Sequence, residues 1–140
     1  MSPRRAEYEP EDLEDDPFFP PPVWSPPLGP SGPVLWSAHL PQHARLLLED
    51  LEPWVEWLAG HYTLDHRIIP PCWAQHWELI EELSALHTAW QDAYAETSHG
   101  DAPLTWHERF APARQRLTDW VARTGCRANE HRTPASVQLR

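Results

Sequence analysis

The chain has 140 residues, of which 41% are hydrophobic and 23% charged, and this composition predicts a single folded domain. Its formal charge of −10 argues against a surface that wraps nucleic acid, and two cysteines are too few for a disulfide-dense secreted scaffold. There is no apolar run near the ~18 residues of a membrane helix and no secretory signal, so we expect a cytoplasmic protein without membrane contact.

Residues 1–41 hold 11 of the 17 prolines and a cluster of acidic residues, which predicts a disordered, acidic, Pro-rich N-terminal arm. The arm also contains Phe18, Phe19 and Trp24, which a simple spacer does not need. Aromatic side chains in a Pro-rich segment are candidates for docking to a partner protein. The alternative is that they fold back onto the domain.

Residues 42–125 are predicted to form an all-α domain, a compact bundle of three to four helices. The first helix begins near Pro41, and Pro53 inside it predicts a kink or a new helix start. The second spans residues 73–95. The third begins at a capping box headed by Thr105, bends at Pro112 and ends at Gly125. Residues 126–140 are predicted to be a polar tail.

The second and third helices carry two sets of candidate binding residues. One set could face a partner protein, although tryptophans in a small domain are also the simplest core residues: Trp73, His76, Trp77, Trp90, Trp106 and His107. The other set could bind phosphate groups of nucleic acid: Arg109, Arg114, Arg116, Arg123 and Arg127. The competing interpretation of the arginines is ion pairing with Glu78, Glu82 and Glu96.

The sequence contains no complete catalytic motif, so we expect no catalytic residues and no enzyme activity. His107-Glu108 begins like a zinc-protease helix, but Ala111 stands where the second histidine belongs. Structural zinc is an alternative, with Cys72-x3-His76 and Cys126-x4-His131 forming a Cys2His2 set. Because these spacings are irregular, the sequence favours a protein with no cofactor and no essential metal.

The segment from Pro70 to Trp90 resembles a known pattern, P-x-C-W-x-x-H-P-x-x-V-x-x-L-x-A-L-x-x-A-W. Trp77 replaces the proline after His76, and Ile80 replaces the valine. The chain is thereby similar, over about residues 52–125, to an actinobacterial family of short Trp-rich proteins, domain of unknown function 4913. The resemblance implies carriage on plasmids, integrative elements or phages of high-GC bacteria. It implies no activity and no catalytic residue.

The function favoured by the sequence is that of a non-catalytic accessory or adaptor protein of a mobile element, acting through contacts with another protein. The first alternative is a nucleic-acid-associated regulator that uses the Arg-rich third helix. The second is an acidic DNA mimic that inhibits a defence enzyme, although many of the acidic residues lie in the N-terminal arm rather than on a folded face. The sequence does not predict the oligomeric state.

Overall fold

A computed structural model describes residues 32–126 and residue 131. It contains three long helices, α2 (Pro41–His61), α3 (Trp77–Ala93) and α4 (Ala102–Thr124), and two 3-10 turns, η1 (Trp36–Ala38) and η2 (Trp73–Gln75). The described residues form no strand, so the predicted all-α class is confirmed. None of the described helices is both long and apolar enough to cross a membrane.

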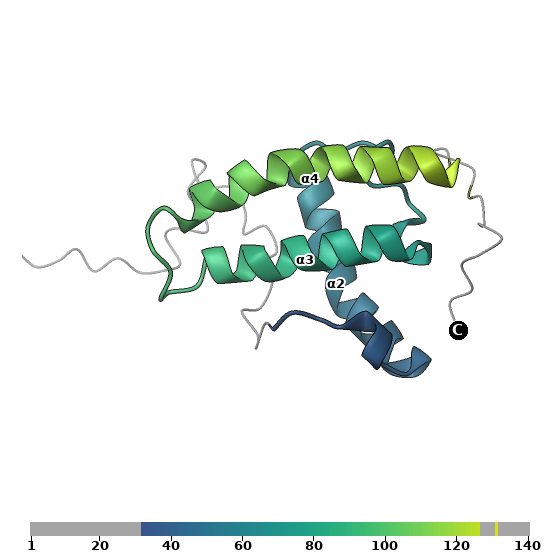
Figure 1. Cartoon of the computed structure of the whole chain (residues 1–140), viewed down its shortest axis with the longest axis horizontal. Coiled ribbons are helices and arrows are strands. Elements are labelled where there is room, and N and C mark those ends of the chain that lie inside the picture. Colours follow the sequence, from purple (N-terminus) through teal and green to yellow (C-terminus); the bar gives the residue numbers. More distant parts are fainter. Residues whose placement is uncertain (1–31, 127–130, 132–140) are drawn as a thin grey trace, which may run out of the picture.

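Two of the three long helices form a pair, and the third crosses this pair. Helices α3 and α4 lie side by side and run in opposite directions, and α2 crosses behind them (Figure 1). This layout differs from a bundle in which all the helix axes are nearly parallel. It brings the start of α3 close to the end of α4, which is the place where the candidate site forms.

The helix limits differ from the prediction at two starts. Trp73–Gln75 is a separate turn, because His76 has extended backbone angles and α3 begins only after it. Helix α4 begins at Ala102, before Thr105, and no side chain caps it. The Thr105 hydroxyl instead donates to the Asp101 carbonyl, 3.3 Å away, so the predicted capping box is wrong.

The predicted C-terminal cap of α4 is confirmed, because Gly125 has φ 74°, a left-handed conformation that glycine adopts without strain. The two internal prolines end no helix. Helix α2 continues through Pro53, and α4 continues through Pro112. Neither proline therefore starts a new element.

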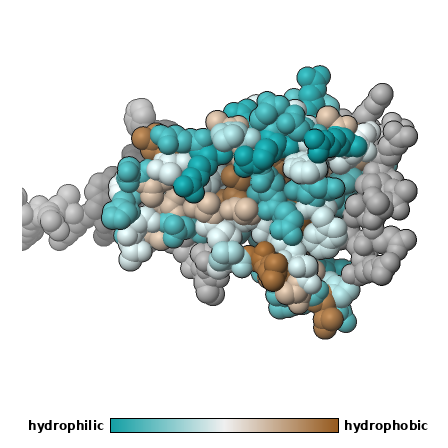
Figure 2. Space-filling view, viewed as in Figure 1, coloured by the Kyte–Doolittle hydropathy of each residue, from teal (hydrophilic) through white to brown (hydrophobic). Residues whose placement is uncertain are grey.

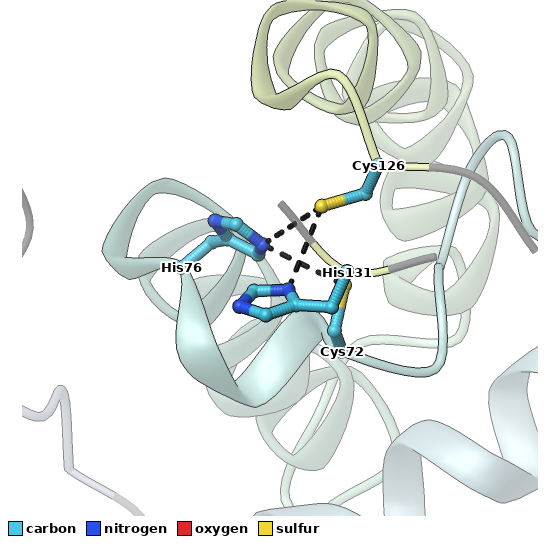
Figure 3. A group of neighbouring side chains, drawn as sticks. All are labelled: Cys72, His76, Cys126 and His131. Atoms are coloured by element: carbon cyan, nitrogen blue, oxygen red, sulfur yellow. Dashed lines mark hydrogen bonds between the residues drawn. The ribbon is translucent and has the colours of Figure 1, made fainter. Parts of the chain in front are cut away.

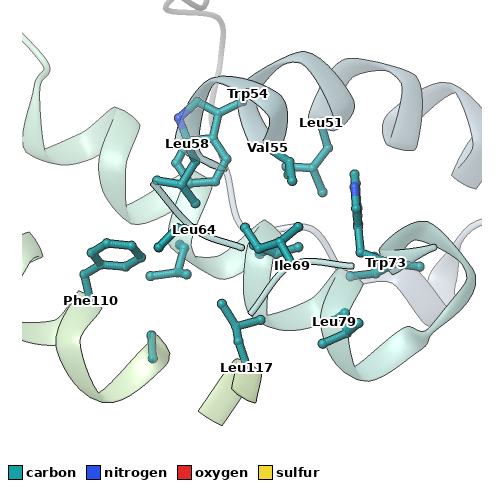
Figure 4. Close-up of a cluster of buried hydrophobic side chains, with 14 of the residues drawn as sticks. Leu51, Trp54, Val55, Leu58, Leu64, Ile69, Trp73, Leu79, Phe110 and Leu117 are labelled. Atoms are coloured by element: carbon teal, nitrogen blue, oxygen red, sulfur yellow. The ribbon is translucent and has the colours of Figure 1, made fainter. Parts of the chain in front are cut away.

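The hydrophobic core lies where the apolar faces of the three helices meet (Figure 4). The side chains of Trp54, Leu58, Leu79, Leu83 and Leu117 have no exposed surface. They come from the predicted apolar stripes, since residues three or four positions apart share one face of a helix.

The core also extends into the predicted arm. Trp36 is only 2% exposed and its ring lies 6.2 Å from that of Trp77. The boundary predicted at residue 41 therefore places a core residue, Trp36, in the arm. The sequence could not indicate the burial of Trp36, because no periodic apolar pattern surrounds it. The candidate docking residues Phe18, Phe19 and Trp24 lie outside the described residues.

Candidate metal centre

Four potential metal ligands converge at one end of the α3–α4 pair. One ligand atom from each of Cys72, His76, Cys126 and His131 lies within 4.8 Å of the other three (Figure 3). Cys72 precedes η2, and His76 lies between η2 and α3. Cys126 follows the last residues of α4, and His131 comes five positions later. Two segments distant in the sequence therefore supply two ligands each.

The η2 turn sets the positions of the first two ligands. The His76 backbone N–H donates to the Trp73 carbonyl, 3.1 Å away, which closes the turn. Cys72 and His76 then lie on the same side, with the Cys72 Sγ 3.6 Å from the His76 Nε2. Trp73 is buried in the core, so the turn is anchored to the domain.

The end of α4 brings the other two ligands to this turn. Gly125 redirects the chain, and the backbone N–H of Cys126 donates to the Thr124 hydroxyl, 3.1 Å away. The Cys126 Sγ lies 3.4 Å from the His76 Nε2 and 3.6 Å from the His131 Nδ1. Cys126 thus stands between the two histidines.

These separations match the edges of a zinc tetrahedron. With Zn–S and Zn–N bonds of about 2.3 and 2.05 Å at tetrahedral angles, a sulfur and a nitrogen ligand should be about 3.6 Å apart. Three of the four sulfur–nitrogen distances between the ligands are 3.4, 3.6 and 3.6 Å, and all the ligand atoms lie within 4.8 Å of one another. The side chains therefore need little rearrangement to coordinate one ion.

Burial favours the uncharged forms of Cys72 and His76. The pKa of the Cys72 thiol is raised to about 11, mainly by burial and further by the neighbouring Cys126 thiol. The pKa of His76 is lowered, first by burial and then by His131. A neutral imidazole is ready to bind metal, and a bound dication stabilises the thiolate form of a coordinating cysteine.

Two further polar atoms lie buried beside the site without a hydrogen-bond partner. They are the Nδ1 of His76, the ring nitrogen that does not face the cluster, and the Oε2 of Glu78. The Glu78 carboxylate acts to raise the pKa of His76, against the larger effect of burial. Metal-binding histidines commonly donate their second N–H to a carboxylate, which fixes the orientation of the ring. The His76 Nδ1 and the Glu78 Oε2 do not hydrogen-bond to each other in the structure, and Glu78 is the candidate for that role when a metal is bound.

The predicted partner-binding residues do not share one exposed surface. Trp73 and Trp106 are core residues, and the Trp106 indole N–H donates to the Leu86 carbonyl, 3.1 Å away. His76 belongs to the ligand cluster. Trp77 packs near the start of α3 and Trp90 near its end, while His107 is exposed on α4. The length of α3 separates Trp77 from Trp90, and the spacing pattern did not take this length into account.

Two of these predicted residues, Trp90 and His107, belong to one aromatic group that forms where α2 ends, together with Trp57 and Tyr62. The Tyr62 hydroxyl and the His107 Nε2 are 2.9 Å apart, and the Trp57 and Trp90 rings are 5.3 Å apart. These residues come from different helices, so no local spacing could have indicated their contact. Because half-buried aromatic residues join three helices here, the group stabilises their crossing.

Four arginines of the predicted phosphate-binding set, including Arg109, are exposed on α4, and three of the four contact a neighbouring side chain. Arg116 forms an ion pair with Glu82 of α3, as the ion-pairing interpretation predicted. Arg114 lies over the Phe110 ring and Arg123 over the Trp120 ring, at 5.8 and 4.9 Å from the ring centroids. Arg127 lies outside the described residues.

Comparisons with known proteins leave the four-residue cluster as the main guide to function. No family model, no curated protein and no solved structure matches the chain. The resemblance to the actinobacterial Trp-rich family therefore stays a prediction.

Proposed function

We propose that the chain is a non-catalytic helical domain that binds one structural zinc ion and acts as an accessory protein through contacts with another protein. The observation that carries the zinc assignment is the convergence of Cys72, His76, Cys126 and His131 at tetrahedral spacing. The sequence alone favoured no metal because of the irregular spacings, and the folded positions of the side chains now favour the alternative.

The ligand types support zinc over other common cations. Two thiolates and two imidazoles form a soft, nitrogen-containing set, whereas magnesium and calcium prefer oxygen ligands. Four protein ligands fill the tetrahedral coordination that structural zinc adopts, and catalytic zinc keeps one position open for water. The set therefore suits a structural ion.

A bound ion would join the segment at residues 72–76 to the chain end at residues 126–131. Cross-linking Cys72 to Cys126 closes a loop of about 55 residues, for which the chain-entropy relation gives about 4 kcal/mol of stabilisation. The ion would hold α4 against the start of α3. A reducing compartment such as the cytoplasm would keep both thiols available for the metal.

A catalytic cysteine is a poorer explanation of the same cluster. A nucleophilic cysteine needs a lowered pKa and an accessible thiolate. Burial instead raises the pKa of Cys72 to about 11, and only 8% of the residue is exposed. These properties support a ligand role and a non-catalytic protein.

The test is elemental analysis of the full chain purified without a histidine tag. We expect one equivalent of zinc, and on cobalt substitution the visible absorption of a tetrahedral thiolate site. Cys126→Ser and His131→Ala should each weaken metal retention, whereas the matched control His66→Ala, which changes an exposed histidine outside the cluster, should not. Absence of metal from the parent, or full retention by a Cys72→Ser/Cys126→Ser double variant, would contradict the proposal.

The alternative of a nucleic-acid regulator rests on exposed arginines of α4. It has less support, because Arg114, Arg116 and Arg123 each contact a neighbouring side chain. A mobility shift with duplex DNA that weakens with salt would favour it over the adaptor role. The DNA-mimic alternative depends on the acidic residues near the N-terminus, which lie outside the described residues.

A further inference from the structure

The ligand cluster contains both cysteines of the chain. Cys72 and Cys126 are free thiols, and their sulfur atoms lie within 4.8 Å of each other. Both sulfurs point into the cluster (Figure 3). Burial raises the pKa of Cys72, and a side-chain hydrogen bond with the Cys126 thiol raises it further, so the two thiols interact directly. Because the sequence has no third cysteine, an intramolecular disulfide has one possible connectivity.

The two sulfur atoms need only a small approach to form a covalent bond. Two sulfurs on adjacent corners of a zinc tetrahedron are about 3.8 Å apart, whereas bonded sulfurs are about 2 Å apart. Neither cysteine lies within an α-helix, since Cys72 precedes η2 and Cys126 follows the left-handed Gly125. The backbone at both positions can therefore adjust without breaking the hydrogen bonds of α3 or α4.

The two cysteines differ in their access to solvent. Only 8% of Cys72 is exposed, while Cys126 is half-buried and follows the exposed Gly125. A small oxidant therefore reaches Cys126 first. Bound zinc holds a coordinating cysteine as the thiolate, and the thiolate is the form that oxidants attack.

We propose that Cys72 and Cys126 form a reversible disulfide when the protein meets a peroxide, and that this disulfide expels the zinc ion. The release of zinc rests on the proposed zinc site, whereas formation of the disulfide requires only the two cysteines. The modification makes metal binding respond to the redox state of the compartment.

The reaction balances as a two-electron oxidation of two thiolates by hydrogen peroxide. The Cys126 sulfur attacks one peroxide oxygen, so that an S–O bond forms, the O–O bond breaks and hydroxide leaves. The Cys72 thiolate then attacks the sulfur of the Cys126 sulfenic acid, so that the S–S bond forms, the S–O bond breaks and a second hydroxide leaves. Two protons from solvent convert both hydroxides to water. His76 and His131 then fill only half of the tetrahedral coordination, and the ion leaves.

The experiment treats the reduced, zinc-loaded full chain with a slight excess of hydrogen peroxide. We expect release of about one equivalent of zinc to a chromogenic chelator, loss of both free thiols, and a metal-free mass lower by that of two hydrogen atoms. Reduction with dithiothreitol in the presence of zinc should restore the starting form. Retention of both thiols, oxidation to sulfinic acid without a disulfide, or a disulfide found only between copies would overturn the proposal.

Two variants separate the disulfide from the zinc site. Cys72→Ser, treated with peroxide in the presence of dimedone, should give the dimedone adduct of a Cys126 sulfenic acid, because no second thiol is left to react with it. The matched control His131→Ala keeps both cysteines and should form the disulfide although it binds zinc weakly. A parent chain that forms the disulfide but contains no zinc would contradict the proposed zinc site alone. A zinc-loaded parent that keeps both thiols would contradict this inference alone.

Discussion

Replacing His87 by leucine should remove a pH-dependent loss of stability. The His87 ring packs against the buried Trp54 ring in a tilted arrangement, with ring centroids 4.7 Å apart, and its Nε2 is buried without a hydrogen-bond partner. Burial lowers the pKa of His87 to about 4, from an ordinary value of 6.5. The unfolded chain therefore binds a proton in this pH range more readily than the folded chain does.

The sign and size of the effect follow from this difference. Because the pKa of His87 is lowered in the folded state, the neutral side chain contributes fully to the free energy of unfolding above pH 6.5. This contribution is lost as the pH falls from 6.5 toward 4. A shift of this size corresponds to about 3 kcal/mol, and partial solvent contact reduces the expected loss to about 1.5–2 kcal/mol. Leucine cannot be protonated, so His87→Leu should not lose this stability.

The measurement is urea unfolding of the parent and His87→Leu between pH 4 and 7.5. We expect the free energy of unfolding of the variant, relative to the parent, to rise by about 1.5–2 kcal/mol as the pH falls across this range. Other titrating groups contribute equally to both proteins and cancel in the difference. A difference that does not change with pH would show that His87 has the same pKa in the folded and the unfolded chain, and it would refute the reasoning.

Four further predictions concern the core, the arm and the ligand shell. Leu83→Ala should lower the free energy of unfolding by about 2–5 kcal/mol because Leu83 has no exposed surface, whereas Trp90→Ala, at a half-buried position, should cost about 1–2 kcal/mol in the same urea titration. Deleting residues 1–38 removes the buried Trp36 and should lower the free energy of unfolding by about 3–5 kcal/mol. Deleting residues 1–31 should lower it by less than about 1 kcal/mol, and equal losses for the two deletions would place the core boundary elsewhere. Gly125→Ala should cost about 1 kcal/mol by thermal unfolding, because alanine is strained at φ 74°. Glu78→Gln should weaken zinc binding about 10–100-fold, measured in competition with a chromogenic chelator, and Glu81→Gln at an exposed position is the control. Equal zinc affinities of the two variants would exclude a positioning role for Glu78.

The sequence by itself determined the helical class and the faces that the helices bury. Local periodicity is sufficient for this, because side chains such as Leu79 and Leu83 repeat at the spacing of a helical turn and share one face. Gly125 as the end of α4 was also predictable, since only glycine adopts a left-handed cap at little cost. The helix starts were less predictable. Thr105 has the pattern of a cap, but Asp101 and Pro103 already place it inside α4.

Only the tertiary structure decided which of the sequence alternatives for the site is the better supported. The two Cys–His pairs were visible in the sequence, but their spacing could not show whether residues 50 positions apart meet. They meet because α3 and α4 are antiparallel, which places the start of one beside the end of the other. Burial of Trp36 and the orphaned Glu78 Oε2 depend on the same long-range packing. Local sequence patterns specify individual helices, but the distance between two side chains on different elements depends on how the whole chain packs.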